Sequence, residues 1–147
     1  MGYYSTMSLK SFKTPLSQEE LEERFRKFLQ RVPKCNRPYL EMYTVKVGPD
    51  HTVQIVPEDG DHYAKHYASG SLAEFISDVI APDDQTVLEF VGEDGTRWGY
   101  LITRGHVEEI LYVPCVQQNG RLVFLEEAVR GHRSSRIWRG RYADAAR

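Results

Sequence analysis

Two histidines four residues apart form the clearest arrangement in this chain that could bind a metal. His62 and His66 lie in the segment 61–67, DHYAKHY, which follows Glu58 and Asp59. On a helix the two imidazoles would share one face, which is how proteins often present zinc ligands. A metal site also needs a third ligand and supporting hydrogen bonds. The sequence offers nearby carboxylates but no clear third ligand, so we expect no bound metal and no cofactor.

A second interpretation of the same segment involves no chemistry. Gly70 follows closely and weakens the case for a helix, because glycine is a poor helix former. The segment would then be a polar loop in which Tyr63 and Tyr67 dock on the protein and the two histidines face water. An enzyme built around His62 and His66, a small hydrolase or transferase, remains an alternative.

Signatures of nucleophilic catalysis and of phosphate binding are absent from the sequence. It contains no GxSxG, no GxxxxGK and no GxGxxG. Cys115 lies in a strand-like run without a cationic neighbour to stabilise its thiolate, so we expect an inert thiol. Glu108 and Glu109 are adjacent on an expected strand and point to opposite faces, so they form no acid–base pair. We therefore favour a protein that is not an enzyme.

The end of the chain has the composition of a contact surface for an anionic partner. Residues 130–147 hold six arginines and one aspartate, a net +5, which leaves −7 on residues 1–129. Arginine binds phosphate through its forked guanidinium and stacks on bases. The expected partner-binding residues are Arg133, Arg136, Trp138, Arg139, Arg141 and Tyr142. The partner would be a protein or a nucleic acid, and the alternative is a tail that packs on its own acidic body or is frayed.

Two helices are predicted to position these groups. Ser17 and Glu20 form a capping box, apolar residues follow at helical spacing, and Pro33 ends the first helix. A second helix is predicted from Ser71, with a capping box to Glu74, and ends at Pro82.

Strands fill most of the remaining sequence. A hairpin is predicted from 39–47 and 52–56, and four more strands near 86–91, 96–103, 107–114 and 121–125, with a possible strand or arm in residues 1–15. Asp94-Gly95 and Asn119-Gly120 supply the positive φ that two-residue type I′ turns require. Trp98 and Tyr100 share a face with Ile102 and are expected to pack in the core. The predicted class is α+β, an antiparallel sheet (hairpin plus C-terminal meander) with two helices packed on one face.

Length and composition set the wider frame. The chain has 147 residues, which suits one domain of residues 1–129 followed by a basic C-terminal tail, 130–147. It has no apolar run long enough to cross a membrane, and its first residues lack the apolar stretch of a secretory signal, so we expect no secretory signal and no membrane association. Two cysteines 80 positions apart are expected to be reduced thiols in a cytoplasmic protein.

Three stretches resemble a known group of proteins. The opening MGYYS, the run PLSQEE at 15–20 and the run GTRWGY at 95–100 are similar to small uncharacterised bacterial and phage-borne proteins that open MGYY(S/T). The group has no assigned activity, so the resemblance supplies no site residue and implies only a link to phage or mobile elements. With the missing catalytic signatures, it favours a binding or accessory protein that acts through a macromolecular partner.

Overall fold

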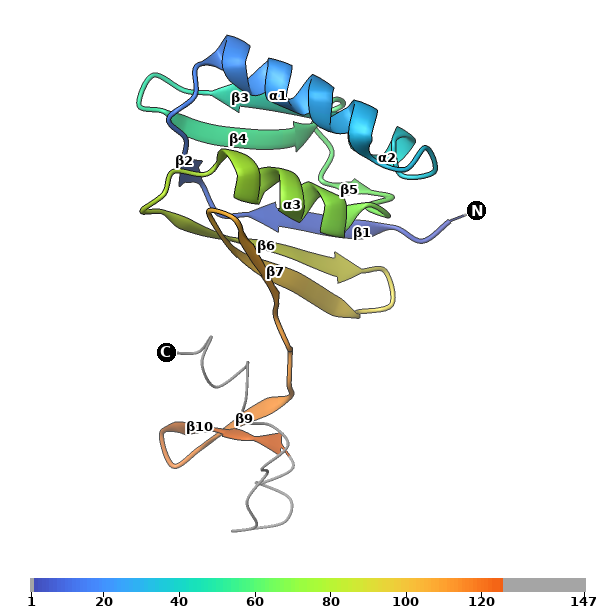
Figure 1. Cartoon of the computed structure of the whole chain (residues 1–147). Coiled ribbons are helices and arrows are strands. Elements are labelled where there is room, and N and C mark those ends of the chain that lie inside the picture. The colour runs from blue at the N-terminus through green and yellow to red at the C-terminus, as the bar shows by residue number, and fades with distance from the viewer. Residues whose placement is uncertain (1, 126–147) are drawn as a thin grey trace. The chain divides into compact units, whose positions relative to one another are not determined.

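The computed structural model describes residues 2–125 (Figure 1). The chain forms two compact units, residues 1–109 and 110–147. The domain boundary predicted before residue 130 lies outside the described residues and stays a prediction. Among the described helices, none is long and apolar enough to cross a membrane.

The two units contain helices and antiparallel strands, which confirms the predicted α+β class. The elements of the first unit are β1 (Ser5–Leu9), β2 (Phe12–Lys13), α1 (Gln18–Arg31), α2 (Pro38–Glu41), β3 (Tyr43–Val47), β4 (Thr52–Pro57), β5 (Tyr63–Ala64), α3 (Ser69–Val79), β6 (Gln85–Gly92), β7 (Arg97–Thr103) and β8 (His106–Glu109). The second unit contains β9 (Cys115–Gln118) and β10 (Arg121–Phe124).

The N-terminal segment contributes one strand to each of two sheets in the first unit, β1 to one and β2 to the other. A five-stranded sheet has the order β5-β1-β6-β7-β8, and a three-stranded sheet has the order β2-β4-β3. β1 pairs with β6 from Ser5 opposite Gly92 to Leu9 opposite Leu88. Only three residues after Leu9, Phe12 pairs with Val53 of β4. The N-terminal strand is therefore internal to the fold.

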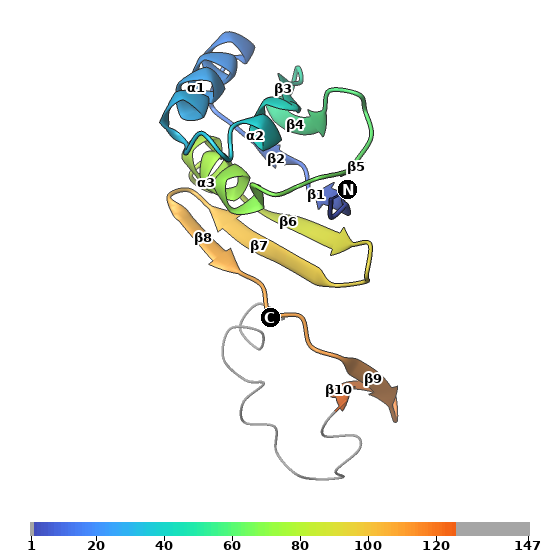
Figure 2. The same cartoon turned by 90° about the vertical axis from the view of Figure 1, so that its right-hand side faces the viewer.

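Helices α1 and α3 cover one side of these strands (Figure 2). Helix α1 contacts β3, and α3 contacts β7 and β8. Between the helices, Phe75 of α3 packs edge-on against Phe25 of α1 at 5.0 Å between ring centroids and lies 5.3 Å from Phe28. These rings form part of a continuous apolar core, as the helical spacing of α1 predicts.

The predicted start of α1 is confirmed. The backbone N–H of Glu20 donates to Ser17 Oγ, and the Glu20 carboxylate accepts from the Ser17 N–H, which completes the capping box. The capping box predicted for α3 is wrong. That helix begins at Ser69, and its N-cap Ala68 makes no side-chain cap. Buried Ser69 lies in contact with Tyr100 and Trp98, so tertiary packing extends the helix beyond its local signal.

The strand predicted from Tyr39 begins later, at Tyr43. Residues 38–41 form the short helix α2, with Pro38 at its first position. Proline suits that position because its fixed φ matches the helix and its missing N–H would have no partner there. Leu40 of this helix is fully buried, so α2 contributes a side chain to the apolar core.

The two predicted hairpin turns both form, but one is of a different type. Asn119 and Gly120 have φ of 52° and 74°, as a type I′ turn requires. In the β6–β7 hairpin Gly95 has a φ of 85°, while Asp94 does not have a positive φ. The Gly95 N–H donates to the Gly92 carbonyl, and Gly92 N–H donates to Thr96 O. This hairpin loop is longer than the two-residue type I′ turn, and in it a turn is followed by a glycine in the left-handed backbone conformation.

The predicted meander is interrupted. β6, β7 and β8 pair in sequence, but β8 ends at Glu109 rather than continuing to residue 114. The strands β9 and β10 form a separate two-stranded sheet in the second unit, with Arg121 opposite Gln118. Pro114 precedes β9, and a proline lacks the N–H that a continuous strand would need.

Candidate binding site

The segment with both predicted histidines is extended, not helical. The N–H of Tyr63 donates to the Asp61 carboxylate at 2.9 Å, a local turn that directs the chain into β5. There Tyr63 stands opposite Thr6, and the His62 carbonyl accepts from the Met7 N–H at 3.1 Å. Successive side chains of this segment therefore point to opposite sides.

His66 is a buried residue of the core. Only 3% of it is exposed, and its Nε2 lies 2.8 Å from the His62 carbonyl. Since a carbonyl only accepts, Nε2 carries the proton and Nδ1 accepts from the Tyr43 hydroxyl at 2.5 Å. Burial lowers the pKa of His66, which favours this neutral form. Both ring nitrogens are engaged, so His66 has no lone pair for a metal.

His62 is exposed, as the loop interpretation expected, whereas His66 is not. The same interpretation placed Tyr63 and Tyr67 against the protein, and both do contact it, through the Tyr4 and Tyr39 rings, while remaining 45% and 46% exposed. Within residues 2–125, no three His, Cys, Asp or Glu side chains come together to hold a metal ion. Whether the isolated protein carries metal stays a prediction.

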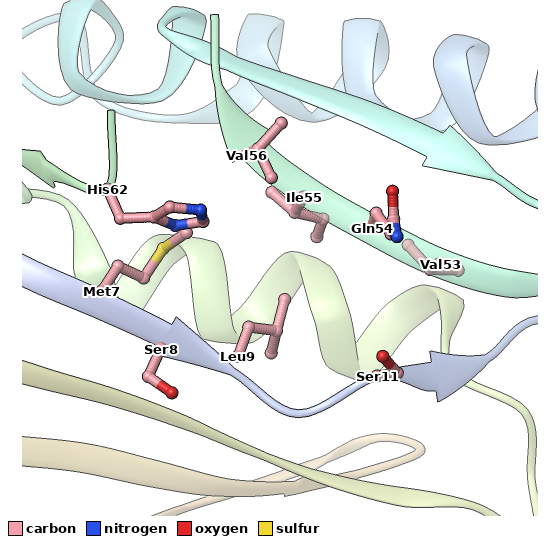
Figure 3. Close-up of a pocket in the computed structure, with 9 residues that line it drawn as sticks. All are labelled: Met7, Ser8, Leu9, Ser11, Val53, Gln54, Ile55, Val56 and His62. Carbon is pink, nitrogen blue, oxygen red and sulfur yellow. The ribbon is translucent and has the colours of Figure 1, made fainter. Parts of the chain in front are cut away.

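An open cavity lies beside His62. It has a volume of about 400 Å³ and separates β1 from β4. Figure 3 shows Met7 and Leu9 of β1 on one side and Ile55 of β4 on the other, with His62 at one end. Met7 and Ile55 are buried, while Ser8, Ser11 and Gln54 are exposed at the rim. The cavity thus combines an apolar floor with a polar edge.

A set of aromatic side chains surrounds the start of β1. We call it the tyrosine cluster, and its members are Tyr3, Tyr4, Tyr39, Tyr63, Tyr67 and Trp98. The Tyr4 and Tyr63 rings stack at 5.3 Å between centroids, and the ammonium of Lys65 lies 5.6 Å from the Tyr4 centroid. The remaining contacts are Tyr39 with Tyr67 at 4.8 Å and Tyr3 with Trp98 at 6.3 Å.

Hydrogen bonds fix the cluster to the backbone. The Tyr67 hydroxyl accepts from the Tyr3 N–H at 2.6 Å. The Tyr3 hydroxyl in turn donates to the Asp94 carboxylate in the β6–β7 hairpin. This bond raises the pKa of Tyr3 and lowers that of Asp94, because it stabilises the protonated phenol and the ionised carboxylate. These two bonds therefore restrict the rings of Tyr3 and Tyr67.

The exposure of the cluster separates it from the core. Tyr4 is 36% exposed, Tyr63 45% and Tyr67 46%, and within residues 2–109 no other large apolar or aromatic side chain is comparably exposed. Trp98 is half-buried and stacks on buried Phe90 at 5.3 Å. The cluster thus has a buried base and an exposed rim.

Sequence reasoning found only part of this site. Trp98, Tyr100 and Ile102 pack on or in the core, as expected from their shared face. Nothing in the sequence assigned Tyr3, Tyr4 or Tyr39 to a binding site. The adjacent pair Tyr3 and Tyr4, and Tyr63 with Tyr67 four residues later, were the only local signals. The missing information was the pairing of β1 with β5, which places Ser5 opposite Ala64 and Thr6 opposite Tyr63, residues far apart in the sequence.

The predicted partner-binding residues of the tail lie outside the described residues. These are Arg133, Arg136, Trp138, Arg139, Arg141 and Tyr142. Cys35 and Cys115, the two cysteines of the chain, form no disulfide. Comparison with family models, with curated proteins and with solved structures finds no match to this chain.

Proposed function

We propose that this protein is a non-enzymatic binding or accessory protein whose tyrosine cluster contacts a partner protein. The observation that carries the proposal is that Tyr4, Tyr63 and Tyr67, the exposed large side chains of residues 2–109, meet at the N-terminal segment, where Tyr63 stacks on Tyr4 and the Tyr67 hydroxyl accepts from the Tyr3 N–H. Contiguous exposed aromatic surface usually marks an interaction site. The partner-binding function expected of the arginine-rich tail would act in addition to this surface.

Tyrosine suits a protein interface for physical reasons. Its ring covers a large area with only two rotatable bonds, so little side-chain entropy is lost on binding. Its hydroxyl can hydrogen bond at the edge of the contact. Here ring stacking and the Tyr3–Tyr67 hydrogen bond already restrict the side chains, which reduces the entropy lost on association further.

The two alternatives have less support. An enzyme centred on His62 and His66 would need His66 to exchange protons, and its ring is buried and bonded at both nitrogens. Nucleic-acid binding through the arginine-rich tail, the second alternative, falls outside the described residues, and the net −7 on residues 1–129 disfavours a nucleic-acid contact by the rest of the chain. We propose a cytoplasmic location, where the thiols of Cys35 and Cys115 would stay reduced. We also propose an origin in a phage or mobile element, as the resemblance of the stretches MGYYS, PLSQEE and GTRWGY implies.

Affinity capture from cells of the source organism tests this function. The full chain is compared with the double variant Tyr4→Ala/Tyr63→Ala, and eluates are analysed by mass spectrometry and stained for nucleic acid. We expect one protein to be captured stoichiometrically by the natural chain and lost with the double variant.

A matched control is Lys27→Ala, an exposed change on α1. It should retain the partner, since α1 contributes no residue to the tyrosine cluster. A partner retained equally by both variants would contradict the assigned surface, and a captured nucleic acid without protein would favour the alternative function.

A further inference from the structure

The cavity between β1 and β4 lies where one further strand could pair with both of them. In Figure 1, β2 and β5 lie at opposite ends of the space between these two strands. β5 pairs with β1 only at Ser5 and Thr6, and β2 pairs with β4 only at Thr52 and Val53. β6 pairs with the far edge of β1 and β3 with the far edge of β4, but within residues 2–125 no strand pairs with the facing edges of β1 and β4 between these two ends. The cavity of about 400 Å³ occupies this gap.

Backbone groups on both sides point into the gap. The Met7 N–H donates toward β5, and the direction repeats every second residue, so Leu9 directs its N–H and C=O into the cavity. On β4, Glu58 donates to Met42 on the β3 side. By the same alternation, Ile55 directs its backbone groups away from β3 and into the cavity. The gap therefore offers strand hydrogen bonds on two sides.

The outer edges of the same sheets are protected. Gln18 of α1 covers β3, where its amide donates to the Val45 carbonyl at 3.1 Å and accepts from the Val47 N–H at 2.7 Å. This side chain takes the place of a neighbouring strand. The outer strand of the five-stranded sheet, β8, carries Glu108 and Glu109. Short, charged and covered edges are the usual protection against unwanted strand pairing, so the open cavity stands out as an exception.

We propose that the cavity binds a short extended segment of a partner protein, which completes the interrupted strand and carries basic residues. At 3.3–3.4 Å per residue, the stretch from Met7 to Ser11 accommodates roughly four residues. The basic character follows from the exposed carboxylates of Glu58, Asp59 and Asp61 in the loop that leads to His62. This site is distinct from the tyrosine cluster and does not depend on it.

A peptide array tests the proposal. The labelled full chain is applied to a positional-scanning array of hexapeptides, and we expect selected peptides to contain lysine or arginine. The best peptide is then resynthesised with single N-methyl groups. Because the cavity bonds both edges of the guest, methylation at either of two consecutive central amides should weaken binding about tenfold.

Addition to a single outer edge predicts a different pattern. There only every second amide bonds the protein, so methylation would weaken binding at alternate positions only. That pattern, or an array with no bound peptide, would overturn the proposal.

Variants of the protein add a second test. Ser11→Trp places a bulky ring in the cavity, since Ser11 lines it, and should weaken peptide binding at least about tenfold. Lys10→Trp is the matched control, because the neighbouring side chain points to the other side. Binding should persist in Lys10→Trp and in Tyr4→Ala. Equal loss in Ser11→Trp and Lys10→Trp, with both melting normally, would contradict the site; if Ser11→Trp fails to fold, the methylation pattern decides.

Discussion

Two groups of aromatic rings in the first unit have similar ring spacing and opposite exposure. Phe25, Phe28 and Phe75 lie 5.0–6.4 Å apart, and the tyrosine cluster has spacings of 4.8–6.3 Å. The phenylalanines are at most 8% exposed, whereas the outer tyrosines are at least 36% exposed. Ring packing alone therefore does not distinguish core from surface. The difference is that burial already stabilises the first group, while the second leaves apolar area exposed.

The largest expected effect lies in the buried group. Phe75→Ala should lower the free energy of unfolding by about 3–5 kcal/mol, because it removes a fully buried ring and leaves a cavity between the helices. Chemical denaturation measures the change. Phe75→Leu, which retains most of the volume, should cost clearly less. Similar losses for the two variants would mean that the site is not tightly packed.

A smaller effect is expected at the hydrogen bond beneath the tyrosine cluster. Tyr43→Phe keeps the ring but leaves Nδ1 of His66 without its donor, at a cost of about 1–3 kcal/mol. Tyr100→Phe is a suitable comparison, since that hydroxyl bonds Ser69 in a less buried position. A Tyr43→Phe protein as stable as the natural chain would remove the Tyr43–His66 bond from this account.

The same histidine predicts a dependence of stability on pH. Burial lowers the pKa of His66 below its usual 6.5, so the unfolded chain binds a proton that the folded chain excludes. Stability should therefore fall as the pH drops from about 7.5 to 5.5 across that usual value. Denaturant midpoints of the natural chain and of His66→Gln measure the slope, and the variant should show a shallower one. Parallel slopes would contradict the neutral, buried state of His66.

The part of the fold that sequence reasoning recovered depends on local signals. The capping box at Ser17, the spacing of α1 and the turn at Asn119 act over a few residues, and each is present in the structure. The errors arose where distant contacts decide. Ser69 begins α3 because Tyr100 and Trp98 contact it, and β5 forms because β1 lies beside it. The tyrosine cluster depends on such pairing, so its members could not be joined from sequence.

The exposed group should show the smallest effect on stability. Tyr4→Ala removes one stacked ring from a largely solvated pair, and the cost should be about 0.5–1.5 kcal/mol. Thermal melts of Tyr4→Ala and Tyr63→Ala measure it. A loss as large as that of Phe75→Ala would assign these tyrosines to the core and remove the contrast between the two groups.

The most direct test of the proposed function compares partner capture with stability in the same variant. In Tyr4→Ala/Tyr63→Ala, we expect a folded protein whose melting temperature falls by only a few degrees and whose partner is no longer captured, while Lys27→Ala retains it. A folded double variant that captures the same partner as the natural chain would contradict the claim that the tyrosine cluster is the binding surface.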